Sequence, residues 1–529
     1  MRQKILLVFT IVASLSLISC FSDDSVDLDY SFADFEVSGI ESEYTKTSYV
    51  GEKLEISPIV ETGFPESDVA YEWMLLSDKT GTITEKGDTI QPTVISQEKN
   101  LNYEVNLAPG TYQLRFLVHN TRNNYTSITA TRLVTVTEFS SGFYILKETA
   151  DGKTDLDLYT RSGSMASDLL LKTKGESLQG KPHSLWINYS QYYINPDNDQ
   201  IETSNSVSVI TDQKQFLILR TSDLGTMFDR SNLLFDEMDP NEQPYAFFFQ
   251  LMYGTVYLSS NGLRYANQPD AKFGSSKSAG KFGMPDPSFT GSQYVVMGPG
   301  SYGGINFWDT GTNSILGANY NFMASPIVYS DFSGEELTQN LTNYECLSAG
   351  RSSVSGTETD NVILQDKSTG ARYIYLMSNS FFGQNLTKRI IIPANSHFAK
   401  AVHYATSGQA ARYIYAAENN HIYAINYEAD EYEEIDIPTP GIGQGENITY
   451  VANSYIAGSG DSNFDYLIVG TQQGNHYKLY MFETVGGAPT GNAIMVAEGE
   501  GIVKSVRNVS PGTSLSSFSF GYPVYPIND

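Results

Sequence analysis

The sequence predicts an all-β protein in which an N-terminal β-sandwich precedes a large β-propeller-like domain. Short runs of alternating apolar and polar residues recur along the 529-residue chain, with turn-forming residues between them. Tyr (36), Phe (27) and Gly (44) are abundant, as is typical of strands joined by tight turns. Helical periodicity is almost absent. The length corresponds to about three domains, or to one small and one large domain.

The charge balance excludes one broad class of function. Lys and Arg total 33 against 60 Asp and Glu, so the formal net charge is -27. Such a chain repels phosphate backbones and anionic lipid, which excludes nucleic acid as a partner. At 40% hydrophobic residues it can bury a large core, which excludes wholesale disorder.

Residues 1–19 have the layout of a secretory signal peptide. Arg2 and Lys4 precede an apolar run, Ile5 to Ile18, that is too short for a comfortable transmembrane helix. The run ends in Leu17-Ile18-Ser19-Cys20, which resembles the bacterial lipobox. The resemblance implies that Cys20 becomes the lipidated first residue of the mature chain, and several acyl chains anchor more firmly than one. The alternative is an ordinary signal peptide with an incidental cysteine.

Residues 20–36 form a polar, acidic segment that we expect to act as a flexible tether. Ser22, Asp23 and Asp24 resemble the export signal that sends Bacteroidetes lipoproteins to the outer face of the cell. This resemblance implies an outer-membrane protein that is lipid-anchored and faces the extracellular side. The alternative is a generic solvated linker.

Residues 37–138 are predicted to form the sandwich. About 100 residues with strands at this spacing favour the immunoglobulin type. Trp73 is expected in the core between the sheets, and Tyr112 near the corner that leads into a late strand. The predicted strands include Lys53–Ile56, Tyr71–Leu75, Thr111–Phe116 and Thr131–Val136.

Residues 139–529 are predicted to form the propeller-like domain. Hairpins recur at a loose spacing of about 45–60 residues, which suggests six to eight blades. They turn around Ser260-Asn261-Gly262, Asn419-Asn420 and Gln473-Gly474. No WD or kelch signature is present, so the blade number stays open. Cys346, the only other cysteine, leaves the mature chain without an intramolecular disulfide and is interpreted as a structural thiol in a strand.

Together, several sequence features resemble the PKD-like family surface lipoproteins of Bacteroidetes SusC/SusD-type nutrient-uptake loci. They are the Tyr-x-Trp strand at Tyr71, the Pro109 to Phe116 strand, the Ser141 to Leu146 junction and the lipobox. The resemblance implies a non-enzymatic accessory subunit of a SusC/SusD-like TonB-dependent importer. It also implies partners, namely a SusC-like transporter, a SusD-like lipoprotein and other surface lipoproteins of the locus, with oligopeptide or glycan as ligand.

Motif searches assign no catalytic, metal-binding or ligand-binding residue. The six histidines lack zinc-site spacing; His397 and His403, for example, lie six apart. Gly298 to Gly303 matches Gly-x-Gly-x-x-Gly, but Ile305–Trp308 behind it reads as a strand rather than the helix that a dinucleotide fold needs. Gly274 to Lys281 approximates a P-loop with the wrong spacing. Apart from the lipid on Cys20, no cofactor is expected.

Two groups of residues have competing interpretations. Asp151, Asp155 and Asp157 could supply oxygens to calcium, but they lack EF-hand spacing, so a hairpin turn with solvated acids is favoured. The aromatic runs Tyr245–Phe249 and Tyr302–Trp308 could be exposed binding loops, but buried blade strands are favoured.

Two alternatives to the accessory-subunit hypothesis remain. One is a surface glycan- or peptide-degrading enzyme, most simply a glycosidase or lyase, on the propeller scaffold. It requires carboxylates that converge from distant strands, which a sequence cannot nominate. The other is a purely structural partner of the transporter, which requires a large apolar interface.

Overall fold

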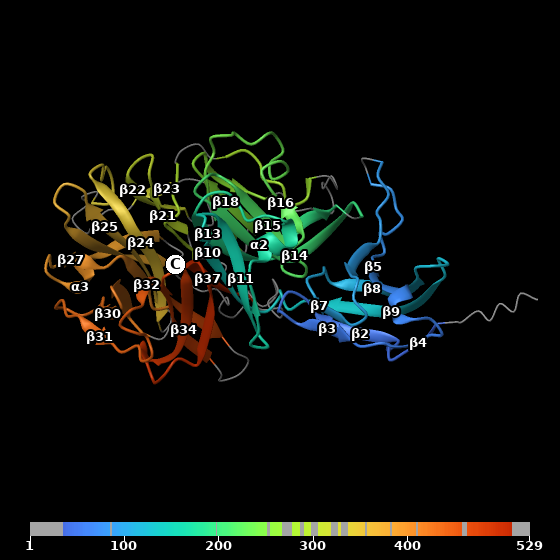
Figure 1. Ribbon diagram of the computed structural model, residues 1–529. Helices are drawn as coiled ribbons and strands as arrows, with labels where there is room; N and C mark the ends of the chain where they lie inside the picture. The colour runs from blue at the N-terminus through green and yellow to red at the C-terminus, as the bar shows by residue number, and fades with distance from the viewer. Residues whose placement is uncertain are drawn as a thin grey trace, which may run out of the picture. The chain divides into compact units, whose positions relative to one another are not determined.

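The computed structural model describes most of the chain, and nearly all of its regular structure is β-strand (Figure 1). The predicted all-β class is therefore confirmed. The predicted signal peptide, Cys20, Ser22, Asp23 and Asp24 lie outside the described residues, as do Gly298 to Gly303. The described ranges are 35–84, 87–196, 198–250, 254–266, 278–285, 290–297, 305–318, 326–328, 337–354, 357–380, 383–408, 411–457 and 463–509.

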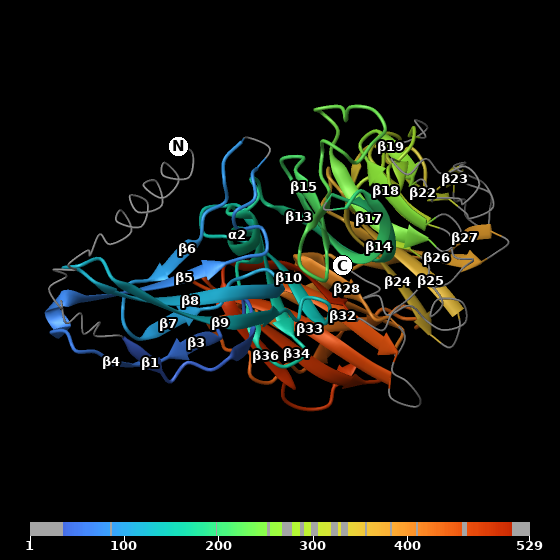
Figure 2. The ribbon, with the colours of Figure 1, turned by 90° about the vertical axis from the view of Figure 1, so that its right-hand side faces the viewer.

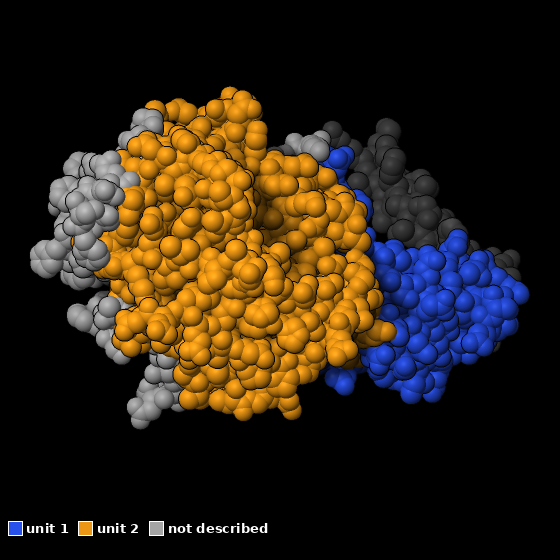
Figure 3. Space-filling view, turned by 90° about the vertical axis from the view of Figure 1, so that its left-hand side faces the viewer, with its two compact units in different colours: residues 1–43, 55–102, 112–132 blue, residues 44–54, 103–111, 133–529 orange. Residues whose placement is uncertain are grey.

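The chain divides into two compact units, which Figure 3 shows in different colours. Unit 1 comprises residues 1–43, 55–102 and 112–132, and unit 2 comprises residues 44–54, 103–111 and 133–529.

The first part of the chain forms the sandwich strands, drawn in blue and cyan in Figure 2. One sheet has the order β2-β9-β8-β5-β6, and two shorter pairs are β1-β4 and β3-β7. The elements are β1 (Glu36–Ser38), β2 (Glu43–Thr47), β3 (Lys53–Ile56), β4 (Ile59–Glu61), the 3-10 helix η1 (Glu66–Asp68), β5 (Val69–Leu76), β6 (Thr93–Ser96), β7 (Leu101–Glu104), β8 (Gly110–Asn120) and β9 (Thr126–Val136).

Trp73 lies in the core of the sandwich, as predicted. Its side chain is 1% exposed. It lies opposite Phe116 in the β5–β8 ladder, with ring centroids 4.5 Å apart. The indole nitrogen donates a hydrogen bond to the Lys99 carbonyl (3.2 Å), so burial leaves no unpaired donor. Tyr112, expected at the corner, is half-buried on β8.

In unit 2, the described residues form seven sheets, each one blade of a propeller. From the innermost strand outward, blade 1 is β37 (Ile502–Val509), β10 (Gly142–Glu148), β11 (Thr154–Thr160) and β12 (Met165–Ala166); blade 2 is β13 (Pro182–Asn195), β14 (Gln200–Thr211), β15 (Phe216–Arg220) and β16 (Thr226–Phe228); blade 3 is β17 (Pro244–Gln250), β18 (Gly254–Ser259) and β19 (Gly262–Tyr265); blade 4 is β20 (Val295–Met297), β21 (Ile305–Asp309), β22 (Ser314–Ala318) and β23 (Pro326–Val328).

The later blades follow the same order. Blade 5 is β24 (Tyr344–Val354), β25 (Thr357–Asp366), β26 (Arg372–Ser380) and β27 (Gly383–Ile392); blade 6 is β28 (His403–Thr406), β29 (Tyr413–Glu418), β30 (His421–Asn426) and β31 (Ile435–Ile437); blade 7 is β32 (Asn447–Ala457), β33 (Asn463–Gln473), β34 (His476–Val485) and β36 (Met495–Glu500), with β35 (Ala488–Pro489) also pairing β34. In the described part of the unit, two short helices, α2 (Leu169–Lys174) and α3 (His397–Lys400), lie between strands.

The first blade is built from both ends of the unit. Strand β37, near the end of the chain, pairs antiparallel with β10, so that Tyr144 lies opposite Arg507 (Figure 1). This pairing closes the ring of blades and removes the two sheet edges that an open array would expose.

Among the described residues, seven hydrophobic clusters fill the spaces between neighbouring blades. Each cluster draws its residues mainly from two consecutive blades, and the last joins blade 7 to blade 1 through Leu479, Ile145 and Val506. Each blade therefore covers the facing sheets of both neighbouring blades. This explains why aromatic strands such as β17 are buried. Phe247 and Phe248 there are 0% and 1% exposed, so this run is a blade strand rather than a binding loop.

Buried asparagines add hydrogen bonds between blades. Asn188 of blade 2 donates to the Phe247 carbonyl of blade 3 (3.1 Å). Asn361 of blade 5 donates to Thr406 of blade 6 (2.8 Å). Asn453 of blade 7 accepts from the Gly408 amide of blade 6 (2.8 Å). Because an unpaired buried polar group is costly, these bonds fix how neighbouring blades are aligned.

Candidate functional site

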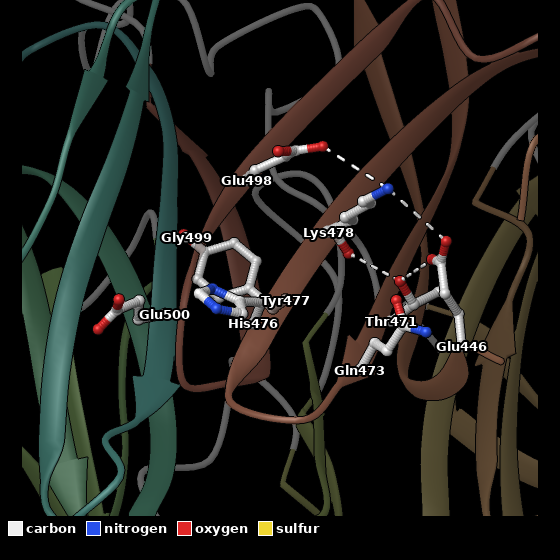
Figure 4. Close-up of a pocket in the computed structure, with 9 residues that line it drawn as sticks. All are labelled: Glu446, Thr471, Gln473, His476, Tyr477, Lys478, Glu498, Gly499 and Glu500. Carbon is white, nitrogen blue, oxygen red and sulfur yellow. Dashed lines mark hydrogen bonds and ion pairs between the residues drawn. The ribbon is translucent and has the colours of Figure 1, made fainter. Parts of the chain in front are cut away.

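A pocket of about 250 Å³ lies on blade 7 (Figure 4). Its walls come from β33, β34, β36 and the turn before β32. The lining residues are Glu446, Thr471, Gln473, His476, Tyr477, Lys478, Glu498, Gly499 and Glu500.

Strand register brings the polar side chains of this pocket together. On β34 and β36, Lys478 lies directly opposite Glu498, and His476 opposite Glu500. Gln473 of β33 lies opposite His476 across a hairpin turn. Since strand side chains alternate between faces with a period of two, these five residues share one face of the sheet.

Glu446 forms the fixed side of the pocket. It follows a turn in which its amide donates to the Gly443 carbonyl (3.1 Å). Its carboxylate accepts hydrogen bonds from the hydroxyls of Thr471 (2.6 Å) and Tyr480 (3.0 Å to each oxygen). Burial, and then this neighbouring carboxylate, raise the pKa of Tyr480, which stays a donor at physiological pH.

Lys478 lies between two of the three carboxylates of the pocket, those of Glu446 and Glu498 (Figure 4). Its Nζ is 3.8 Å from Glu446 and 3.7 Å from Glu498, and both distances exceed those of a hydrogen bond. The Lys478 side chain is 41% exposed and that of Glu498 is 66% exposed. His476, Gln473 and Glu500 are exposed as well. The pocket thus presents donors and acceptors that a ligand can reach.

Tyr477 anchors the floor of the pocket to blade 1. It points to the opposite face from Lys478 and is 0% exposed. Its ring lies across Gly499, where an added Cβ would meet ring atoms at 2.5 Å. Its hydroxyl donates a hydrogen bond to Asp157 of β11 (2.6 Å).

Behind Tyr477, Asp157 belongs to a buried ion-pair cluster. Lys147 lies 2.7 Å from Asp157 and 2.7 Å from Asp168, with side chains of Lys147 and Asp157 only 2% and 0% exposed. Burial raises the pKa of Asp157, against the opposing effects of Lys147 and Tyr477. Burial alone would lower the pKa of Lys147, but its two carboxylate partners raise it.

The expectation of solvated acids at a hairpin turn is wrong for Asp155 and Asp157, which are both 0% exposed. Asp155 accepts hydrogen bonds from the amides of Leu170 (2.9 Å) and Leu171 (3.3 Å), and so caps α2. The expectation holds for Asp151, which is exposed in the turn and pairs with Lys153 (2.8 Å). Both faces of β11 are covered. Its aspartates are therefore buried on one face of the strand, and its leucines are buried on the other.

The structure also shows where Cys346 and three of the histidines lie. Cys346 is buried in the cluster between blades 4 and 5, and burial raises the pKa of its thiol. His397 lies at the start of α3, stacked on Tyr423 at 3.7 Å. His403 is half-buried, and burial followed by the charge of Lys504 lowers its pKa to about 4. His476 is the one histidine of the six that lines the pocket.

No group of three or more His, Cys, Asp or Glu residues within the described ranges is placed to hold a metal ion. No helix in the described part of the chain is long and apolar enough to cross a membrane.

Residues 20–182 match the sequence profile of the PKD-like family. No curated protein matches the chain significantly. The fold and this match define a protein with a PKD-like N-terminal segment and a propeller-like second unit.

Three solved structures resemble this chain at low sequence identity. A quinoprotein alcohol dehydrogenase-like protein from Bacteroides thetaiotaomicron is 15% identical with a TM-score of 0.46, covering 88% of this chain and 97% of that one. The Dos1 propeller is 9% identical (TM-score 0.35; 75% and 88% covered). PorZ, a bacterial surface component of the type-IX secretion system of Porphyromonas gingivalis, is 11% identical (TM-score 0.21; 76% and 55% covered). At these TM-scores the likenesses carry no argument, and the propeller assignment rests on the seven sheets.

Proposed function

We propose that this protein is a surface-exposed outer-membrane lipoprotein that acts as a non-enzymatic accessory subunit of a SusC/SusD-like TonB-dependent importer. One observation carries the proposal: the match to the PKD-like family begins at residue 20, where the lipobox places the lipidated cysteine. The family profile therefore starts at the first residue of the proposed mature chain and continues through the acidic tether into the sandwich.

The surroundings of three buried acids support structural roles for them. Asp157 is paired with Lys147, Glu242 with Arg264, and Asp360 with Arg351. A glycosidase needs two carboxyl groups that face a substrate cleft at a set separation. These acids instead neutralise buried cations within single blades. Their arrangement supports a structural role for each of them.

The blade-7 pocket supports a role in capture at the cell surface. Its reachable donors and acceptors, above a floor held by Glu446 and Tyr477, are what a weak binding site for a polar nutrient requires. Oligopeptide or glycan is the proposed cargo. A SusC-like transporter and a SusD-like lipoprotein are the proposed partners, and other lipoproteins of the same locus join them.

The test is an affinity purification of the native protein from outer membranes in mild detergent, followed by mass spectrometry. We expect a SusC-like transporter and a SusD-like lipoprotein in amounts comparable to the bait. A Cys20→Ser variant is the matched control, because it lacks the acylated thiol and should leave the membrane fraction. Recovery of the wild-type protein alone would contradict the proposal, and so would an unchanged membrane fraction for Cys20→Ser.

A further inference from the structure

We propose that the blade-7 pocket is a subsite for one ring of a neutral glycan. The inference rests on the proposed function and selects the glycan from the two proposed cargoes. It is argued from the chemistry of the pocket wall, the spacing of its charged groups, and its size and rigidity.

The wall of the pocket offers donors and acceptors side by side. Lys478 and Gln473 supply N–H donors, and Glu498 and Glu500 supply carboxylate acceptors, with Lys478 and Glu498 directly opposite each other. A sugar hydroxyl both donates and accepts, so neighbouring hydroxyls can use both members of such a pair. A neutral polyol therefore offers partners to both the donors and the acceptors of this wall.

Charged ligands fit the same wall poorly. An ammonium group offers only donors, so it would compete with Lys478 for the pocket carboxylates and leave the N–H groups of Lys478 and Gln473 without acceptors. A carboxylate, sulfate or phosphate would meet three glutamates, Glu446, Glu498 and Glu500, in a chain that already carries a net charge of -27. The wall therefore favours an uncharged ligand over a basic peptide or an acidic polysaccharide.

The ion pairs of Lys478 leave room for ligand hydroxyls. With Nζ 3.8 Å and 3.7 Å from its two carboxylate partners, the ammonium makes no hydrogen bond to either. An oxygen placed about 2.9 Å from Nζ would form one. Because Lys478 and Glu498 are partly exposed, their present interaction is weak and is readily exchanged for bonds to a ligand.

The size and rigidity of the pocket fit a single sugar ring. A volume of about 250 Å³ is below the roughly 300–1,000 Å³ of pockets that enclose drug-sized ligands. It therefore accommodates one ring rather than a long segment. The Glu446–Thr471 hydrogen bond holds the fixed side of the pocket and the Tyr477–Asp157 hydrogen bond holds its floor, so binding orders only the side chains of the rim.

The test begins with an array of neutral and charged oligosaccharides probed with the detergent-solubilised full-length protein. The neutral set contains gluco-, manno-, xylo- and galacto-oligosaccharides, and the charged set contains oligogalacturonate and chitosan oligosaccharide. We expect binding to at least one neutral oligosaccharide and none to the charged set. Calorimetric titration with the neutral binder then gives the Kd for wild type and variants.

Lys478→Met and Glu498→Gln each remove one charged member of the central pair and should weaken the Kd at least 10-fold. Glu483→Gln is the matched control, because Glu483 is an exposed carboxylate on the same strand that does not line the pocket. It should keep the wild-type Kd. Thermal melts of all three variants show whether each remains folded.

The subsite proposal is overturned if no neutral oligosaccharide binds, if a charged one binds more tightly, or if Lys478→Met and Glu498→Gln keep the wild-type Kd while folded. Co-purification of the importer without glycan binding would reject the subsite and leave the accessory function standing. Glycan binding that depends on Lys478, without co-purification of the importer, would support the subsite and reject the accessory function.

Discussion

The hydroxyl of Tyr477 donates a 2.6 Å hydrogen bond to Asp157, which lies 320 residues earlier in the chain. The contact joins blade 7 to blade 1 at the seam where the ring closes. It also links the floor of the pocket to the buried Lys147 cluster. Substitutions at the pocket floor should therefore change the stability of unit 2.

Tyr477→Phe should destabilise unit 2 by about 1–3 kcal/mol, because one oxygen of the buried Asp157 loses its donor. The measurement is the shift in thermal or denaturant-induced unfolding relative to wild type. Tyr192→Phe is the control, since Tyr192 is half-buried on β13 and its hydroxyl makes no hydrogen bond within the described residues. Equal stability of the two variants would show that the Tyr477 hydroxyl has no structural role.

Lys147→Met should be more damaging, at about 3–5 kcal/mol, because it leaves a buried carboxylate without its counter-charge. Adding Asp157→Asn should recover part of that loss, which a double-mutant cycle measures. Lys153→Met, at the exposed pair with Asp151, should leave the melting temperature unchanged. Strictly additive effects of Lys147→Met and Asp157→Asn would contradict a direct interaction.

Gly499→Ala should cost about 1–3 kcal/mol, because its Cβ would meet the Tyr477 ring at 2.5 Å and the ring is fixed by Asp157. The same change at Gly491, where an added Cβ has no neighbour within 4 Å, is the matched control. Comparison of their melting temperatures checks the prediction. A wild-type melting temperature for Gly499→Ala would mean that Tyr477 can move without loss.

His403 should make the folded state sensitive to mild acid. Its pKa in the folded protein is lowered to about 4, chiefly by burial, whereas an unfolded histidine titrates near 6.5. Between these values the unfolded chain binds the proton and the folded protein does not, so stability is lost as the pH falls from about 6.5 to 4. At about 1.4 kcal/mol per pKa unit, the loss is at most about 3.5 kcal/mol.

The check is the melting temperature of wild type and His403→Gln across that pH range. The variant should lose less stability on acidification. His421→Gln, at an exposed position on β30, should follow wild type. If the melting temperatures of all three proteins fall in parallel with pH, His403 is not the source of the acid sensitivity.

The acidic residues after the lipidated cysteine should decide which side of the outer membrane the protein faces. Replacing Asp23 and Asp24 with alanine should leave the protein membrane-bound but protected from protease added to intact cells. Replacing Asp27 and Asp29 instead should leave it accessible, because the proposed signal lies directly behind Cys20. Equal protease sensitivity of both variants would reject the signal.

The hairpins of the propeller could be predicted from the sequence because tight turns need particular residues at particular positions. The turns at Gly262, Asn419 and Gly474 join the second and third strands of blades 3, 6 and 7. The number of blades could not be predicted from the sequence, because the closing strand β37 pairs with β10 at the other end of the unit. Pairings over such distances leave no local pattern.

The candidate site was less predictable than the fold. The hairpin at Gln473-Gly474 was expected, yet the pocket also needs Glu446 and strand β36, which only tertiary structure brings alongside. Asp155 and Asp157 were misjudged because an alternating strand normally keeps its acids in solvent, whereas both faces of β11 are covered. A nearby lysine, Lys147, was the one sequence feature that could have suggested a buried pair.

The pairing of β37 with β10 also determines when the propeller can be completed. During synthesis the three outer strands of blade 1 emerge first, and they wait for about 350 residues of later blades before their inner strand appears. Until then the growing chain is an unclosed row of blades with an unpaired edge at β10. A chain stopped or cleaved shortly before Ile502 would keep that edge and, on this account, would be a target for aggregation or proteolysis rather than a smaller working propeller.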